Sequence, residues 1–317
     1  TIFDQVYRNL GGKEDYEPST ISAPSITTDD AFSRWEIQNR LRKKILNKYS
    51  GIVREGRFRS VGFPPEDYGG YLHLRSMLGG PIRRIIDQVR MIKNDMDVNF
   101  KVEAGQIDLP EAIQVIASQT QRSDIFTRED PLRKNEAWNI LIDMSSSISG
   151  MIGEAKSYAT CLAEVAAVAL AEVTAALSGN MEQWGMYGFS DKFYIIKDFD
   201  ERYSSIVKAR IGGIKPRGLT YLPDAIKIAT NIIRASSMNE HNFLVVVSDG
   251  LPAGYNGIEA DLTEALDKAE REGILTLAVG LNTKSIKRFF KHYCTISSPA
   301  DLVKSYLRAY MELSSFA

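Results

Sequence analysis

Five side chains with oxygen ligands are spaced along this sequence in a pattern suited to one metal ion. A largely apolar run over 138–142 is followed at once by Asp-Met-Ser-Ser-Ser. A second apolar run over 243–247 is followed by Ser-Asp-Gly, and the segment 218–223 between the two runs reads Gly-Leu-Thr-Tyr-Leu-Pro. The candidate ligands in these three segments are Asp143, Ser145, Ser147, Thr220 and Asp249.

The candidate ligands are carboxylates and hydroxyls, without histidine or cysteine. This choice favours a hard cation such as Mg²⁺, with Mn²⁺ or Ca²⁺ as alternatives. Two carboxylates and three hydroxyls leave room in an octahedral shell for water or for a ligand from elsewhere. Neutral hydroxyl ligands leave the cation electron-poor, so it would accept a carboxylate from a partner protein. The chemistry predicted for this site is therefore binding.

Each segment also has a purely structural interpretation. Asp143 and the serines after it can close a turn between a strand and a helix. Thr220 can cap the helix that follows it, and Asp249 can form a turn before Gly250. The metal site and these structural roles are alternatives at the level of sequence.

Motifs of the common enzyme classes are missing from the sequence. It contains no Gly-x-x-x-x-Gly-Lys-Ser/Thr loop for ATP, no Gly-x-Gly-x-x-Gly after the first strand, and no Gly-x-Ser-x-Gly elbow around the serines. The three histidines, His73, His241 and His292, share no metal-ligand spacing. We therefore expect no catalytic residues and no enzyme activity of these kinds.

Beyond residue 137, apolar strands alternate with helices. This alternation predicts a doubly wound α/β sheet of mostly parallel strands, with 193–199 as an antiparallel edge strand. Ligands of such sheets bind beyond the carboxyl ends of the strands, where Asp143 and Asp249 both lie. Strands are expected at 138–142, 183–189, 193–199, 243–247, 274–279 and 293–296, and helices at 154–177, 223–234, 259–272 and 300–313.

The part before this domain has a different pattern. Residues 1–30 are polar and rich in helix breakers, and the stretch from 31 to 120 has mainly helical periodicity, with helices expected near 31–50, 82–92 and 110–116. Short extended pieces are expected near 57–61 and 100–102. We expect a mainly helical N-terminal region over 1–135 and an α/β domain over 136–317.

Charge and composition narrow the range of partners. The chain has 317 residues and a net charge of −1, so no global field favours nucleic acid or a membrane. The segment Arg34–Arg59 holds nine basic residues against Glu36 and Glu55, which makes it either a solvated helix face or a docking surface for an acidic partner. Two cysteines, no membrane-length apolar stretch and no signal-peptide pattern at the start favour a cytoplasmic location.

The series Asp143-Met-Ser145-Ser-Ser147, Thr220 and Ser248-Asp249-Gly250 resembles the metal-ion-dependent adhesion site (MIDAS) of von Willebrand factor A (VWA) domains. The resemblance covers about residue 137 to the C-terminus and implies a Rossmann-like sheet with one divalent cation held by the five candidate ligands. Most members of the family have glycine where this chain has Ser146. Because glycine adopts a positive φ more readily, we expect a slightly altered turn there.

A narrower resemblance rests on Gly-Gln-Ile-Asp-Leu-Pro-Glu-Ala at 105–112 and on the segment 289–307. These stretches are similar to intracellular proteins of the cobalt-chelatase large-subunit, nitric-oxide-reductase activation and rubisco-activase adaptor group. The resemblance implies an adaptor between a hexameric MoxR-type AAA+ ATPase and a client protein, with an acidic side chain of a partner on the metal. The alternatives are a subunit of a metal chelatase and an extracellular adhesion or ligand-binding protein. No nucleic-acid partner and no membrane insertion are expected.

Overall fold

The computed structural model gives two compact units, Thr1–Ile45 and Leu46–Ala317. Among the described helices, none has both the length and the apolar character needed to cross a bilayer. Ser147 lies outside the described residues, as do the loosely patterned residues 1–27 and most of the helix expected at 300–313. The residues that the structure describes are 28–53, 56–80, 82–84, 86–87, 96–102, 106–107, 109–118, 126–131, 136–146, 162–178, 183–236, 241–249, 254–298, 301 and 305.

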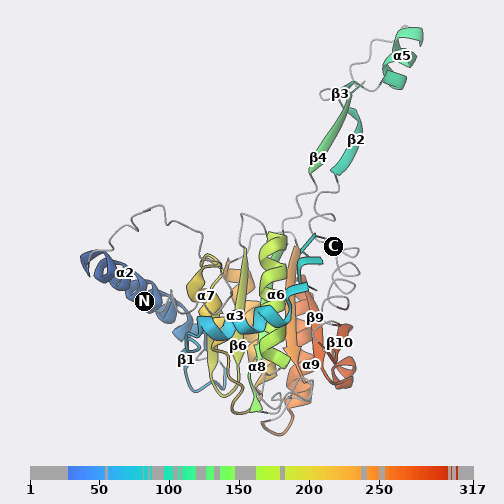
Figure 1. The fold of residues 1–317 in the computed structure, drawn as a ribbon. Helices are drawn as coiled ribbons and strands as arrows, with labels where there is room; N and C mark the ends of the chain where they lie inside the picture. Colours follow the sequence, from blue (N-terminus) through green and yellow to red (C-terminus); the bar gives the residue numbers. More distant parts are fainter. Residues whose placement is uncertain are drawn as a thin grey trace. The chain divides into compact units, whose positions relative to one another are not determined.

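A seven-stranded sheet in the order β1-β7-β6-β5-β8-β9-β10 forms the centre of the larger unit (Figure 1). Every neighbouring pair is parallel except β6 and β7, which form an antiparallel hairpin. The predicted fold class, a doubly wound and mostly parallel sheet, is confirmed. The strands are β1 (Val61–Gly62), β5 (Glu136–Asp143), β6 (Trp184–Phe189), β7 (Phe193–Lys197), β8 (His241–Ser248), β9 (Ile274–Leu281) and β10 (His292–Ile296).

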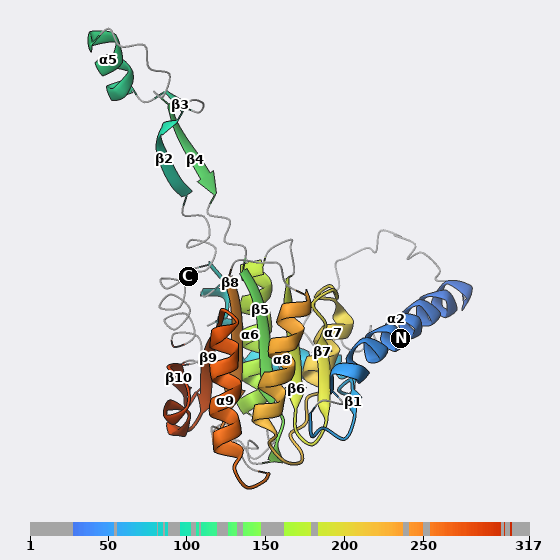
Figure 2. The same cartoon turned by 180° about the vertical axis from the view of Figure 1, so that it is seen from behind.

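Helices cover both faces of this sheet. Figure 1 shows α3 (Tyr68–Met77) and α6 (Leu162–Ser178) over one face, and Figure 2 shows α8 (Leu222–Ser236) and α9 (Ile258–Arg271) over the other. Because the central strands are buried on both faces, they are almost continuously apolar. The many alanines of α6 are buried and let that helix approach the sheet closely.

Strand register brings two carboxyl ends to the same edge. In β5 and β8, Ile142 pairs with Val247, so the next residues, Asp143 and Ser248, are neighbours as well. At the other end of this pair, the rings of Trp138 and Phe243 stack with centroids 4.4 Å apart. Such an aromatic pair contributes about 1 kcal/mol beyond its area burial, which helps to fix this register.

Two features of the sheet differ from the expectation. Strand β7 was expected at the edge, but β1 pairs with it in parallel, with Val61 opposite Phe193. A two-residue strand is too short to be recognised by periodicity. The helix α7 (Ser205–Gly212) was not expected, because its eight residues include the buried Arg210 and therefore lack a clear apolar stripe.

Residues before position 136 contribute to the α/β unit. Helix α3 packs against α6 and α7, and its Tyr71 and Leu74 lie in the main apolar core. The hydroxyl of Tyr71 donates to the carboxylate of Glu172 on α6, and Tyr203 Oη donates to the same carboxylate at 2.9 Å. The core of the α/β unit therefore begins well before the boundary expected at 135/136.

The remaining described elements of the N-terminal part are helical and extended. Helix α2 covers Thr28–Val53 and α5 covers Leu109–Ser118. A separate three-stranded antiparallel sheet has the order β2-β4-β3, and the extended piece expected near 100–102 falls within β2. Its strands are β2 (Met96–Val102), β3 (Gln106–Ile107) and β4 (Phe126–Pro131).

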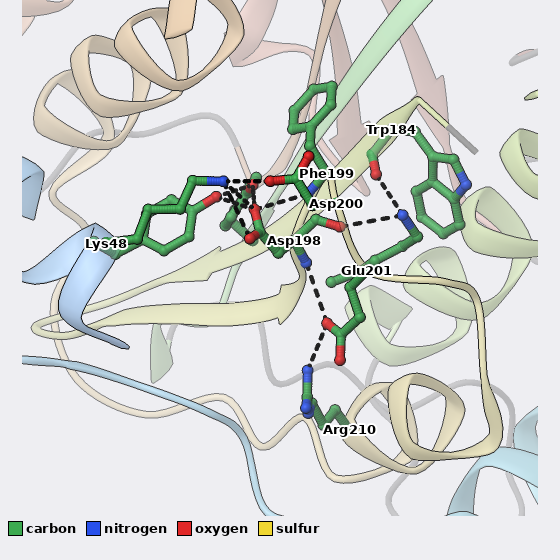
Figure 3. A network of polar contacts seen from close by, with 10 residues as sticks. Lys48, Trp184, Asp198, Phe199, Asp200, Glu201 and Arg210 are labelled. Atoms are coloured by element: carbon green, nitrogen blue, oxygen red, sulfur yellow. Dashed lines mark hydrogen bonds and ion pairs between the residues drawn. The ribbon is translucent and has the colours of Figure 1, made fainter. Parts of the chain in front are cut away.

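A network of polar side chains ties the end of α2 to the sheet at the amino ends of the parallel strands (Figure 3). Asp198, which follows β7, accepts hydrogen bonds from Lys48 Nζ at 3.2 and 3.3 Å, from the Phe199 N–H at 2.8 Å and from the hydroxyl of Tyr49. Tyr49 Oη also lies 2.7 Å from Tyr187 Oη. This buried carboxylate therefore has a cation and several donors from the chain itself.

Candidate metal centre

Asp143 is the last residue of β5 and is completely buried. Its Oδ1 accepts the backbone N–H of Ser145 at 2.9 Å, and its Oδ2 accepts the hydroxyl of Ser248 at 2.8 Å. The first bond is the local turn that an aspartate after a strand commonly makes. The second bond joins the ends of β5 and β8 and fixes the direction of the carboxylate.

A second carboxylate lies close enough to Asp143 to affect its ionisation. Burial raises the pKa of Asp143 to about 7, and the charge of Asp249 adds to that rise. Hydrogen bonds from Ser145 and Ser248 act in the opposite direction. In the described part of the chain, no lysine or arginine forms an ion pair with either carboxylate. Two neighbouring acidic groups in a low-dielectric site without a cation are energetically unfavourable.

Asp249 has a buried oxygen to which no described residue donates a hydrogen bond. It follows β8 directly, and its Oδ1 is buried with no hydrogen bond to any described residue. A buried polar atom without a partner costs about 1–3 kcal/mol, and more if it is charged. A divalent cation in contact with this oxygen would remove that cost and balance the charge of Asp143. The donor set therefore fits a hard metal ion.

The loop that carries Thr220 is hydrogen-bonded to the turn after β5. The N–H of Arg217 donates to the carbonyl of Met144 at 2.5 Å, and the N–H of Ser146 donates to the carbonyl of Gly218 at 3.1 Å. Gly218 has φ +86°, a conformation that favours glycine. Thr220 itself is buried. These bonds hold the Thr220 loop beside the segment that carries Asp143 and Ser145.

Gly254, which lies in the chain between β8 and α9, packs against the Thr220 loop. A Cβ atom on Gly254 would lie 2.9 Å from the ring of Tyr221 and 3.8 Å from the carbonyl oxygen of Thr220. Gly254 also has φ +154°, so a larger residue would be strained as well as crowded. Gly254 therefore lies against the loop that carries Thr220.

Four of the five predicted ligand residues thus belong to segments that meet at one edge of the sheet. Asp143, Ser145, Thr220 and Asp249 are described, whereas Ser147 lies outside the described residues. Within the described residues there is no cluster of three or more His, Cys, Asp or Glu side chains that could hold a metal ion. Metal ligation by these residues stays a prediction.

Two residues of the site were not recognised from the sequence. Ser248 donates to Asp143, and the Ser-Asp-Gly segment was the only signal for it. A slightly altered turn was expected at Ser146, and its φ is not positive, since Asn282 is the only described non-glycine residue with positive φ. The hydroxyl of Ser146 instead donates to the carbonyl of Gly218 at 3.0 Å, beside the bond from its own N–H. Serine therefore adds a link between two segments of the site.

Part of the basic bias of Arg34–Arg59 is neutralised inside the α/β unit. Arg57 lies 3.3 Å from the carboxylate of Asp224 and 3.5 Å from that of Asp261. Its guanidinium also stacks 3.6 Å from the ring centre of Tyr255. This arginine is engaged in positioning the segment before β1 against the start of α8.

Comparisons with known proteins agree with this architecture. Residues 139–251 match the von Willebrand factor type A domain. An uncharacterized protein of Pseudomonas aeruginosa is 24% identical over 173 residues, which are 51% of this chain and 27% of that protein. Protein NorD of Stutzerimonas stutzeri is 22% identical over 220 residues, which are 64% of this chain and 35% of NorD. The matched regions therefore span about a quarter to a third of these relatives.

Among solved structures, proximal thread matrix protein 1 of the mussel byssus, with a zinc-occupied MIDAS motif, is 14% identical with a TM-score of 0.39. That match covers 55% of this chain and 47% of the mussel protein. The domain match over 139–251 coincides with strands β5 to β8 and with the segments of the candidate site. The part of this chain that is similar to the von Willebrand factor type A domain is therefore the part that carries the candidate site.

Proposed function

We propose that this chain is a metal-dependent protein-interaction adaptor, in which Asp143, Ser145, Ser147, Thr220 and Asp249 hold Mg²⁺. The observation that carries the proposal is the pair of neighbouring carboxylates, Asp143 and Asp249, with a buried oxygen of Asp249 that has no partner among the residues the structure describes. When bound, the cation would offer an open coordination position to a carboxylate of a partner protein. Mn²⁺ or Ca²⁺ would occupy the same oxygen set.

The chain's own residues orient this site. Ser248 and the N–H of Ser145 hold both oxygens of Asp143, which leaves Asp143 suited to a supporting role around the ion. The hydroxyl of Ser145 also hydrogen-bonds Asp143. Its oxygen, the hydroxyl of Thr220 and Oδ1 of Asp249 would contact the metal or metal-bound water. Burial of these groups excludes bulk water, so their electrostatic interactions are stronger than at an open surface.

We further propose that the partner is a MoxR-type AAA+ ATPase and that the adaptor couples the motion of its ring to a client protein. The sequence similarity to the MoxR-associated group supports this part of the proposal, as does the similarity to protein NorD over 64% of the chain. The chain lacks an ATP-binding loop of its own, so force would come from the partner.

The test is complex formation with the purified MoxR-type ATPase of the same organism, measured by light scattering after size exclusion. ATP itself needs Mg²⁺, so the metal site is removed by Asp143→Asn at constant Mg²⁺ and not by a chelator. We expect a complex with the wild-type chain and at least a tenfold weaker one with Asp143→Asn.

The matched control is Asp267→Asn, which changes an exposed aspartate on α9 to the same residue. This variant should bind as the wild type does. Equal binding by Asp143→Asn and the wild type would show that the metal site is not used in the complex. No complex with the wild-type chain would remove the ATPase from the proposal.

A further inference from the structure

We infer that the partner segment recognised at the metal centre is acidic over several residues, because exposed basic residues from three separate segments lie at the same edge of the sheet as the centre. These residues are Arg59, Lys192 and Arg217, which we call the basic rim. The inference rests on the proposed metal-dependent function and adds to it the chemistry of the partner. One carboxylate would bind at the metal, and further carboxylates would face the basic rim.

Arg217 is held next to the turn that follows β5. Its backbone N–H donates to the carbonyl of Met144, one residue after Asp143. Arg217 is exposed, and its side chain forms no ion pair with any described residue. Leu219, two positions further, is 47% exposed and places an apolar side chain on the same loop. This loop therefore offers both a positive charge and apolar surface beside the candidate ligands.

Lys192 comes from the turn between β6 and β7. That turn begins directly after Phe189, which is paired with Asp143 across β5 and β6, so it lies at the same edge of the sheet. The turn also touches the Thr220 loop, since a Cβ on Gly218 would lie 2.8 Å from Oδ1 of Asp191. Lys192 is exposed and, within the described residues, has no carboxylate partner.

Arg59 approaches from the segment before β1. Its N–H donates to the carbonyl of Asp191 at 3.0 Å, which joins this segment to the same turn. Its guanidinium lies 3.8 Å from the carboxylate of Asp191, yet the side chain is 75% exposed. Such a long, exposed ion pair contributes little to stability. Most of the guanidinium is therefore accessible to a carboxylate of a partner.

The charge balance of the rim favours an acidic partner. The three cations are opposed within the turn by the single carboxylate of Asp191, whose side chain is 26% exposed. The carboxylates of the metal centre itself would be balanced by the bound ion. Exposed charges at the edge of an interface mainly accelerate association and make it sensitive to salt. The rim therefore selects partners by charge, whereas the metal selects one carboxylate.

The experiment uses the full chain and three fluorescent peptides: alternating Glu and Gly, the same peptide with Gln for Glu, and a glycine peptide with one Glu. Binding is measured by anisotropy in Mg²⁺ for the wild type and for Lys192→Glu/Arg217→Glu. The charge-matched control is Arg202→Glu/Arg271→Glu, two exposed arginines near the opposite edge of the sheet.

We expect the multiply acidic peptide to bind the rim variant about tenfold more weakly, with a reduced dependence on salt. The single-Glu peptide should be affected far less, and the control variant should match the wild type. Mg²⁺ should bind the rim variant at least as tightly as the wild type, because positive charges near the ion have been removed. Opposite effects on metal and peptide cannot arise from simple misfolding.

Three results would overturn the inference. The first is equal binding of the multiply acidic peptide to the rim variant and the wild type. The second is equal binding of the Gln peptide and the Glu peptide to the wild type. The third is binding of a single-stranded oligonucleotide as tight as that of the acidic peptide. If no peptide binds the wild type in Mg²⁺ at all, the proposed metal-dependent function fails as well. This outcome can be told apart from the other three, because in each of those the wild type still binds a peptide.

Discussion

Two buried aspartates at opposite edges of the same sheet have very different surroundings. Asp198, at the amino ends of the parallel strands, is 2% exposed and is bound by Lys48, Tyr49 and the N–H of Phe199. Asp143, at the carboxyl ends, is fully buried, and the donors that bind it in the described part of the chain are neutral. Burial raises the pKa of Asp143, and the charge of a second carboxylate, that of Asp249, raises it further.

Under the proposed function, Asp198 is a structural carboxylate and Asp143 belongs to a binding site. A buried charge must be compensated, and at Asp198 the chain supplies the cation itself. At Asp143 and Asp249 the described residues supply hydrogen bonds but no cation, and the proposed metal ion would supply the missing positive charge. The predictions below test whether the two sites differ in this way.

The largest effect is expected at Asp198. The variant Asp198→Asn keeps the shape of the side chain but removes the charge that Lys48 and Tyr49 contact. We expect a loss of about 3 kcal/mol in the free energy of unfolding, equal with and without Mg²⁺. Denaturant unfolding measures it. The control Asp200→Asn removes the exposed partner of Lys48 and should cost less than about 1 kcal/mol. A loss at Asp198 that depends on Mg²⁺ would contradict the comparison.

Metal should stabilise the wild-type chain through Asp143. With Mg²⁺ a hundredfold above its dissociation constant, the free energy of unfolding should rise by about 2.7 kcal/mol. The variant Asp143→Asn should lose this gain. In chelator the same variant should be at least as stable as the wild type, because a buried charge beside Asp249 has been removed. If Asp143→Asn were as destabilising in chelator as Asp198→Asn, the two aspartates would both be structural.

A smaller effect is expected at Gly218, whose backbone has φ +86°. The variant Gly218→Ala should lower the free energy of unfolding by about 2 kcal/mol, because alanine is strained at this φ and its Cβ would lie 2.8 Å from the carboxylate of Asp191. It should also weaken the binding of Mg²⁺. The matched control is Gly273→Ala, which has φ +73° but no atom within 4 Å of the added Cβ. The control should be destabilised less and should keep its affinity for Mg²⁺, as measured by calorimetry. Equal behaviour of the two variants would mean that the Thr220 loop does not need this close approach.

The smallest effect is expected at Ser146. Its hydroxyl links the turn after β5 to Gly218, and Ser146→Ala removes that bond without straining the backbone. We expect the free energy of Mg²⁺ binding to weaken by about 1 kcal/mol or less, which titration calorimetry would measure as a severalfold lower affinity. Ser76→Ala is the control, since the Ser76 hydroxyl bonds only the carbonyl of His73 within its own helical segment. Unchanged affinity in Ser146→Ala would remove the proposed link.

The sequence allowed the central part of the fold to be predicted because its strands are long and continuously apolar. The runs ending at Asp143 and Asp249 could be placed at one edge from the rule that parallel strands share their carboxyl ends. By contrast, β1 has two residues, and α7 contains the buried Arg210, so neither has a readable period. The contribution of Tyr71 and Leu74 to the core depends on long-range packing, which periodicity does not contain.

For the candidate site, the sequence indicated the ligand types and their order but not their supporting contacts. The bond from Ser248 to Asp143 depends on the register of β5 and β8. The role of Ser146 depends on the position of Gly218, which is 72 residues away in the chain. The basic bias around Arg59 was visible in the sequence, but only the fold brings Lys192 and Arg217 to the same edge.

The central claim is that the carboxyl edge of the sheet holds one hard divalent cation. The most direct measurement is anomalous X-ray scattering from crystals soaked in MnCl₂, with Asp143→Asn crystals treated in the same way. We predict a single strong manganese peak about 2.2 Å from Oδ1 of Asp249 in the wild type, and no peak in the variant. Wild-type crystals without a peak at this position, while Asp143 and Asp249 keep the surroundings described above, would contradict the claim.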